Sequence, residues 1–130
     1  MHIKINYREK FTIEQRRNES KNVKKKYPDR IPVIVSKDPS SNLADINKEK
    51  YLIPIDFTVG QLLTIIRQRT SISAENAINL FIIDYNNNQI LAPTSSTIGT
   101  LFTQYVESFI NDKKYDGYLY IVYTGENVFG

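Results

Sequence analysis

Pro54 lies inside the apolar, β-branched run of residues 51–55 and constrains the fold of this chain more than any other residue. The run has the composition of a β-strand. Because proline has no backbone N–H to donate to a central ladder, a strand that contains it belongs at the edge of a sheet. We therefore expect residues 51–55 to form one edge of a sheet.

The rest of the chain alternates between strand composition and helical periodicity. The predicted strands are residues 31–37, 51–55, 78–84 and 118–123, with a short partner at 90–91 that follows a turn at 86–88. The predicted helices are residues 12–26, 58–69 and 96–109, the first two of which begin with a capping box. Thr124 begins a polar tail that is too short to form an element.

The order of these elements predicts an α+β fold of the ubiquitin-like β-grasp type. The first two strands can form a hairpin, a helix can cross one face, and the last strand can insert beside the first. We expect a four-stranded mixed sheet with this crossing helix, preceded by a helical extension. The whole chain, 1–130, is then a single domain with a basic extension at 1–30, a core at 31–123 and a flexible tail at 124–130.

The residue content argues against most catalytic chemistry. The chain has no Cys, and its one His is His2, so a thiolate nucleophile is absent and a His-based metal site or catalytic triad is not expected. Its five glycines form no phosphate-binding motif. The closest carboxylates, Asp112 and Asp116, lie in a polar stretch typical of solvated surface. We therefore expect no enzyme and no bound cofactor.

Charge is concentrated in the first 30 residues, which carry ten Lys and Arg against four acids, whereas residues 31–130 carry seven against ten. Within this basic extension we expect Ile13 and Val23 to be the buried residues. Arg16, Lys21 and Lys24 to Lys26 are expected to be solvated. Such a surface can attract nucleic acid, an anionic membrane or an acidic protein, and charge alone does not decide between them.

Motifs at several separate places resemble the GABARAP-type autophagy ubiquitin-like proteins. They cover nearly the whole chain in order: KKYPDRIPVIV (25–35), KYLIP (50–54), TVGQ (58–61), IRQR (66–69), PT (93–94), GYLY (117–120) and GENVFG (125–130). The resemblance implies an adaptor in the cytoplasm that moves to autophagosomal and related membranes when it carries a lipid. It does not favour nucleic acid as a partner, and we expect a monomer before conjugation.

The resemblance also implies chemistry at the C-terminus. Gly130 would be joined to the amine of phosphatidylethanolamine, and Asn127, Val128 and Phe129 would form the tail that partner enzymes recognise. Activating and conjugating enzymes would use ATP and supply the cysteines that this chain lacks, and a cysteine protease would process the tail or remove the lipid. A terminal Gly has no Cβ to obstruct a narrow enzyme channel.

The same resemblance implies two pockets beside the predicted edge strand, for receptors with an aromatic-x-x-aliphatic motif. The aromatic pocket would be formed by Glu19, Val23, Pro32, Lys50, Leu52 and Tyr118. The aliphatic pocket would be formed by Tyr51, Ile53, Pro54, Phe57, Leu62 and Ile65. Acidic residues that flank the motif would contact Arg30, Lys48 and Arg69. For Val23, Leu52, Leu62 and Ile65, a purely structural core role is equally open.

Some features depart from the family pattern. Tyr118 stands where the family commonly has Phe, and residues 86–89 and 103–114 are longer than usual. Two other functions therefore remain open at this point. One is a ubiquitin-like modifier of a non-autophagic membrane or organelle, and the other is a cytoskeletal or nucleic-acid-binding protein that uses residues 1–30.

Overall fold

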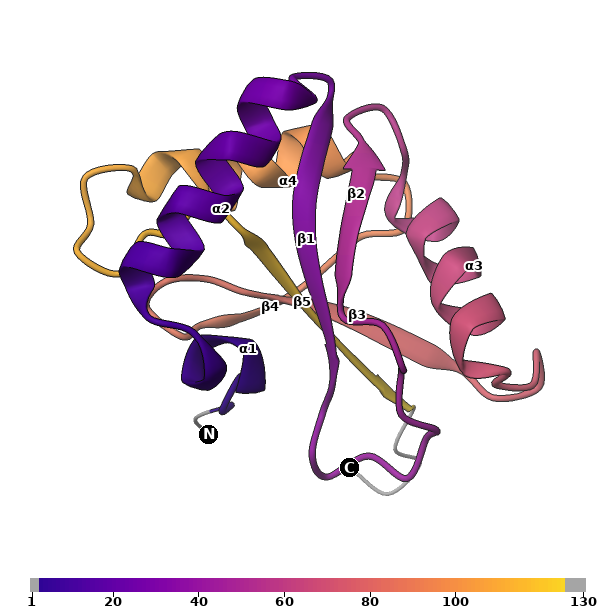
Figure 1. Cartoon of the computed structure of the whole chain (residues 1–130). Coiled ribbons are helices and arrows are strands. Elements are labelled where there is room, and N and C mark those ends of the chain that lie inside the picture. Colours follow the sequence, from indigo (N-terminus) through magenta and orange to yellow (C-terminus); the bar gives the residue numbers. More distant parts are fainter. Residues whose placement is uncertain (1–2, 126–130) are drawn as a thin grey trace.

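A five-stranded sheet with the order β2-β1-β5-β3-β4 forms the centre of the computed structural model, which describes residues 3–125 (Figure 1). The strands are β1 (Arg30–Lys37), β2 (Lys50–Pro54), β3 (Ile78–Ile83), β4 (Gln89–Leu91) and β5 (Leu119–Gly125). β1 and β5 are parallel, and every other neighbouring pair is antiparallel. This confirms the α+β β-grasp fold, with the last strand beside the first.

Two details of the sheet differ from the sequence prediction. The sheet has five strands rather than four, because the short partner β4 pairs with β3. The Asp84 carboxylate supports this hairpin by accepting the backbone N–H groups of Asn86 and Asn88. In addition, β5 continues to Gly125, which pairs with Ile78, so the predicted tail boundary at 124 is two residues too early.

Four helices and one 3₁₀ turn cover the sheet: α1 (Asn6–Lys10), α2 (Ile13–Lys26), α3 (Val59–Thr70), α4 (Ile98–Tyr105) and η1 (Glu107–Phe109). α2 and α3 begin at the predicted capping boxes, in which Thr12 and Thr58 each accept the N–H of the Gln three residues later. The predicted third helix is wrong at its C-terminal end. α4 ends at Tyr105, and the tighter η1 turn places the Phe109 ring 5.7 Å from the Tyr85 ring.

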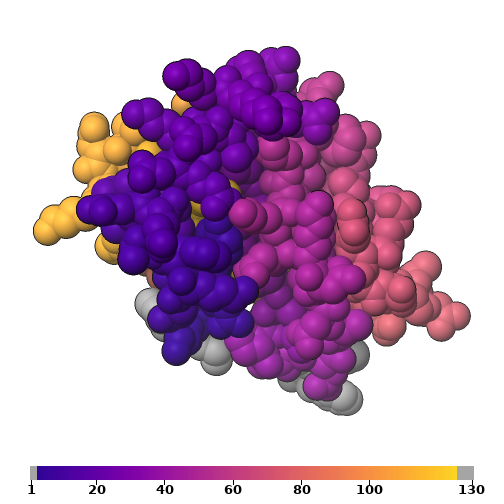
Figure 2. All heavy atoms as spheres, in the orientation of Figure 1, coloured from indigo at the N-terminus to yellow at the C-terminus, as the bar shows by residue number. Residues whose placement is uncertain are grey.

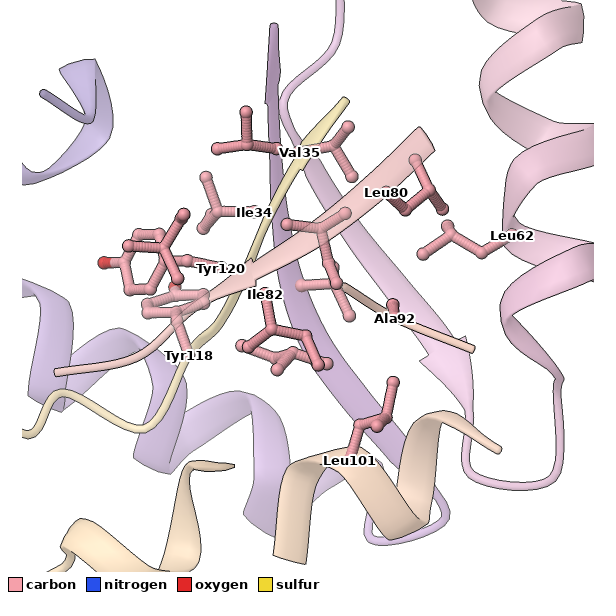
Figure 3. Close-up of a cluster of buried hydrophobic side chains, with 14 of the residues drawn as sticks. Ile34, Val35, Leu62, Leu80, Ile82, Ala92, Leu101, Tyr118 and Tyr120 are labelled. Atoms are coloured by element: carbon pink, nitrogen blue, oxygen red, sulfur yellow. The ribbon is translucent and has the colours of Figure 1, made fainter. Parts of the chain in front are cut away.

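Side chains alternate between the two faces of the sheet, and the register assigns them. Tyr120 shares a face with Ile34, and this face is covered by α1 and α2. Leu80 and Ile82 lie on the opposite face, which α3 and α4 cover. Figure 3 shows this division, with Tyr118 and Tyr120 on one side and Leu62 and Leu101 on the other. The core is therefore built in two layers on one sheet.

The N-terminal extension packs through different residues from those that the sequence predicted. Ile3, Ile5 and Tyr7, which precede or form α1, are buried, whereas Ile13 and Val23 are only half-buried. The prediction considered only the long polar helix and not the apolar residues before it. α2 itself lies on the surface of the molecule, beside β1 and β2 (Figure 2).

Candidate functional site: the β2 edge and its two flanks

β2 exposes one edge of its backbone. Val35 N donates to Glu49 O at 2.8 Å and Ile55 N donates to Asp29 O at 3.1 Å, so the odd-numbered residues of this segment bond to β1. By the alternation of an antiparallel pair, Lys50, Leu52 and Pro54 direct their backbone groups away from β1. The missing N–H of Pro54 therefore costs no ladder bond, and the predicted edge position is confirmed.

The register of β2 separates its side chains onto the two faces of the sheet. Leu52 pairs with Pro32 and Lys50 with Ile34, which places both on the face of α2. Tyr51 pairs with Val33, which places it on the face of α3. One extended segment added to this edge can therefore reach both flanks with alternate side chains.

On the α2 flank, a polar cluster joins helix to strand. The Glu19 carboxylate accepts hydrogen bonds from Tyr118 Oη at 2.7 Å and from Tyr7 Oη at 3.2 Å, and it forms an ion pair with Lys50. Val23 and Leu52 are half-buried beside this cluster, and Pro32 is buried. The structure thus brings together all six residues expected to form the aromatic pocket, on one face and between α2 and β2.

The electrostatics of this cluster keep Glu19 charged. Burial on its own would raise the pKa of Glu19, but hydrogen bonds from Lys50 and Tyr118 outweigh it and lower the pKa. The hydrogen bond to Glu19 likewise raises the pKa of Lys50. Burial raises the pKa of Tyr118, so its hydroxyl stays neutral and can donate. A ligand that enters between α2 and β2 meets a bridged Glu19–Lys50 pair.

On the α3 flank, the expected aliphatic pocket divides into core and accessible residues. Leu62 is fully buried and Ile53 nearly so, which makes them core residues that support the flank from within. Phe57 and Ile65 are half-buried and provide the accessible apolar surface. Pro54 is half-buried too, but it pairs with Arg30, which places its ring on the face of Leu52 and α2 rather than on the α3 flank where it was expected. Helical spacing predicts which residues share this face, but it does not predict how deeply each of them is buried.

Tyr51 contributes a buried hydroxyl to this flank. Within residues 3–125 its Oη has no hydrogen-bond partner. Burial raises the pKa of the phenol, and the nearby positive charge of Arg69 offsets part of that rise. Lys48 Nζ lies 5.3 Å from the centroid of the Tyr51 ring.

The three cations expected to receive acidic flanking residues are all exposed. In the part of the chain that the structure describes, Arg30, Lys48 and Arg69 form no ion pair. They are therefore available to a partner. Each such exposed pairing is worth about 1 kcal/mol or less.

Asp116 is buried behind the α2 flank, so the prediction that this carboxylate is solvated was wrong. Its side chain is fully buried, forms an ion pair with Arg16 and accepts the hydroxyls of Tyr85 and Tyr120. Arg16 is thus not solvated either. The available signal was the alternation Tyr118-x-Tyr120, because phenols on the buried face of a strand need hydrogen-bond partners.

The residues expected to take part in conjugation, Asn127, Val128, Phe129 and Gly130, lie outside the described residues. The described part of β5 ends at Gly125, whose N–H donates to Ser41 Oγ at 3.4 Å. Within residues 3–125, no helix combines the length and apolar character needed to cross a bilayer.

Comparison with known proteins identifies the family. Residues 15–130 match the family described as autophagy protein Atg8, ubiquitin like. The chain belongs to the Atg8 family. Autophagy-related protein 8 of Schizosaccharomyces pombe is 42% identical over 128 residues, which cover 98% of this chain and 96% of that relative. Autophagy-related protein 8 of Pichia angusta is 40% identical, with 98% of this chain and 93% of that relative covered.

The fold agrees with a solved member of the Atg8 family. The crystal structure of Trypanosoma brucei ATG8 superposes with a TM-score of 0.79 at 31% sequence identity, covering 98% of this chain and 99% of that one. The resemblance noted from the sequence motifs is therefore confirmed, together with the ubiquitin-like fold. The chain is an autophagy-type ubiquitin-like protein.

Proposed function

We propose that this Atg8-family protein is a lipid-conjugated modifier that catalyses nothing itself. Gly130 provides the acyl group and phosphatidylethanolamine provides the amine. The observation that carries the proposal is the family match, which continues through residue 130. The protein resides in the cytoplasm and on autophagosomal membranes when it carries the lipid, in keeping with the names of its relatives.

The proposed chemistry is an acyl transfer. A partner enzyme uses ATP to activate the Gly130 carboxylate and passes the acyl group to a partner cysteine as a thioester. The lipid amine then attacks the carbonyl carbon, an amide bond forms, and the thiol leaves with a proton. Hydrolysis of that amide by a cysteine protease restores the free carboxylate and the lipid.

We also propose that the β2 edge recruits receptors that carry an aromatic-x-x-aliphatic motif with acidic flanks. The outward backbone groups of Lys50 and Leu52 support pairing with an added strand. The α2 flank would accept the aromatic side chain and the α3 flank the aliphatic one. The free cations Arg30, Lys48 and Arg69 would contact the acidic flanks.

Deletion of Gly130 tests the conjugation step in cells. A fluorescent protein fused to the N-terminus should mark membranes when the chain is intact and should be diffuse when Gly130 is deleted. Asn111→Ala, at an exposed position before β5, is the control and should mark membranes normally. Membrane recruitment of the deletion variant at the normal level would reject the conjugation proposal.

A further inference from the structure

A second groove lies between α2 and α4, away from the β2 edge. Two adjoining cavities of 520 and 590 Å³ share Lys24, Phe102 and Glu107 as lining residues, so they form one continuous groove, which we call the α2–α4 groove. It extends from the loop before β5 to the start of β1. None of its lining residues belongs to the two flanks of β2.

One end of the α2–α4 groove is preformed. Arg17 Nε donates to Tyr115 O at 2.7 Å and Arg17 Nη2 donates to Lys113 O at 2.6 Å, while Ser20 Oγ donates to Asp116 O. Gly117 has φ +85°, and a Cβ there would lie 2.5 Å from Ser20 Oγ. These contacts hold the loop before β5 against α2, so a ligand would not have to order this wall.

The charge along the groove is uneven. Arg17, Lys21 and Lys24 follow the i, i+4, i+7 spacing that places residues on one face of a helix, and all three line the groove. Arg17 is engaged by backbone carbonyls, whereas Lys21 and Lys24 form no ion pair within residues 3–125. Glu107 is the one acid on the opposite wall that is not buried. Two cations are therefore available to a ligand.

The groove also presents exposed apolar surface. Ile110 is 60% exposed at one end and Ile55 is 43% exposed at the other. Phe102 lies buried between them, with Lys24 Nζ 5.1 Å from its ring centroid. Large apolar side chains beside unpaired cations, in a concave and partly rigid site, are the features of an interaction surface rather than of ordinary solvated surface.

We propose that the α2–α4 groove binds an acidic peptide segment with an aliphatic or aromatic anchor. The anchor contacts Ile110 and Phe102, and the acidic residues contact Lys21 and Lys24. Because the groove shares no residue with the β2 edge, both sites can be occupied together. A partner with one motif for each site would gain affinity through effective concentration.

Selection from a library of random 16-residue linear peptides displayed on phage tests the proposal. The target is the full chain, saturated with an aromatic-x-x-aliphatic peptide to occupy the β2 edge. We expect enriched peptides that place an apolar residue among Asp and Glu. Calorimetry should show about tenfold weaker binding to Lys21→Glu/Lys24→Glu and to Ile110→Asp, each checked for native folding by circular dichroism.

The matched control is Lys25→Glu/Lys26→Glu, which reverses two charges on the same helix outside the groove lining. Affinity for the selected peptides should change less than twofold in this control. An equal loss of affinity in Lys21→Glu/Lys24→Glu and in this control would show a general charge effect and would overturn the proposal. The proposal would also be overturned if no enriched peptide bound more weakly to Lys21→Glu/Lys24→Glu. Binding to phosphatidylserine vesicles that the groove variants abolish, with no such peptide, would assign the groove to membranes and overturn the proposal too.

Discussion

α2 and α3 pack on opposite faces of the same sheet by different means. α3 buries Val59, Leu62 and Ile66, so its attachment is apolar. α2 buries only Ser20, and it is held by the Arg16–Asp116 ion pair and by hydrogen bonds from Arg17 and Ser20 to the loop before β5. The attachment of α3 therefore depends on buried apolar area and that of α2 on a carboxylate with several partners, and the two respond to different changes.

Removal of Asp116 should have the largest effect. Asp116→Ala leaves the guanidinium of Arg16 and the hydroxyl of Tyr120 without this acceptor. Loss of one partner of a buried ion pair costs about 3–5 kcal/mol. Urea unfolding should show this loss, whereas the exposed control Asp56→Ala should stay within about 0.5 kcal/mol of the parent. A loss below about 1 kcal/mol for Asp116→Ala would show that the polar attachment is not needed.

Truncation of Leu62 on the α3 face should have the next largest effect on stability. Leu62→Ala creates a cavity in the apolar layer and should lower the free energy of unfolding by about 2–5 kcal/mol. Leu63, the neighbouring half-buried residue, is the matched control, and Leu63→Ala should lower the free energy of unfolding by clearly less. Equal costs at the two positions would contradict the assignment of Leu62 to the core.

The sequence predicted the apolar face better than the polar one, for a physical reason. Periodicity identifies residues such as Leu62 and Ile66 because burial of an apolar side chain needs only a consistent face. Pro54 likewise identified the edge strand through its missing N–H. Asp116 was misassigned because two of its partners, Arg16 and Tyr85, come from distant segments, and only Tyr120 is close in the sequence. The local Tyr118-x-Tyr120 alternation indicates that buried phenols need an acceptor, but it does not identify Asp116 as that acceptor.

Leu52 and Ile65 test whether one peptide uses both flanks of β2. Binding of an aromatic-x-x-aliphatic peptide should weaken about tenfold, or about 1.4 kcal/mol, for Leu52→Ala on the α2 flank and for Ile65→Ala on the α3 flank. Leu91 on β4, at the other edge of the sheet and 58% exposed, is the control. Leu91→Ala should leave the affinity unchanged in calorimetry, and a loss there equal to that for Leu52→Ala would contradict the site.

High pH should weaken the packing of α2 on the sheet more than that of α3. Burial raises the pKa of four phenols beside α1 or α2, those of Tyr7, Tyr85, Tyr118 and Tyr120. On the α3 face it raises the pKa of two, that of Tyr51 and, to about 12, that of Tyr123. A raised folded-state pKa contributes stability that is present below the unfolded value of about 10 and is lost as pH rises through the folded value. Hydrogen exchange between pH 9 and 11 should accelerate in α2 before α3. The reverse order would contradict the comparison.

Glu19→Gln should give the smallest change. The folded-state pKa of Glu19 is lowered, so its charged form contributes stability above its unfolded pKa of about 4.3, and this contribution is lost as pH falls through the folded value. The difference in stability between parent and variant should therefore be present at pH 7 and should vanish under acid conditions. Thermal unfolding at pH 7 and pH 3 measures it, and a difference that does not become smaller between pH 7 and pH 3 would contradict the charged Glu19–Lys50 bridge.

The central claim, that the Gly130 carboxyl carries a phospholipid, is tested most directly by mass spectrometry of the membrane-bound protein. The C-terminal proteolytic peptide should have the mass of the peptide plus phosphatidylethanolamine minus one water, and fragmentation should place the added mass on Gly130. The soluble fraction should yield the same peptide without the addition. A membrane-bound form whose C-terminal peptide is unmodified would contradict the account.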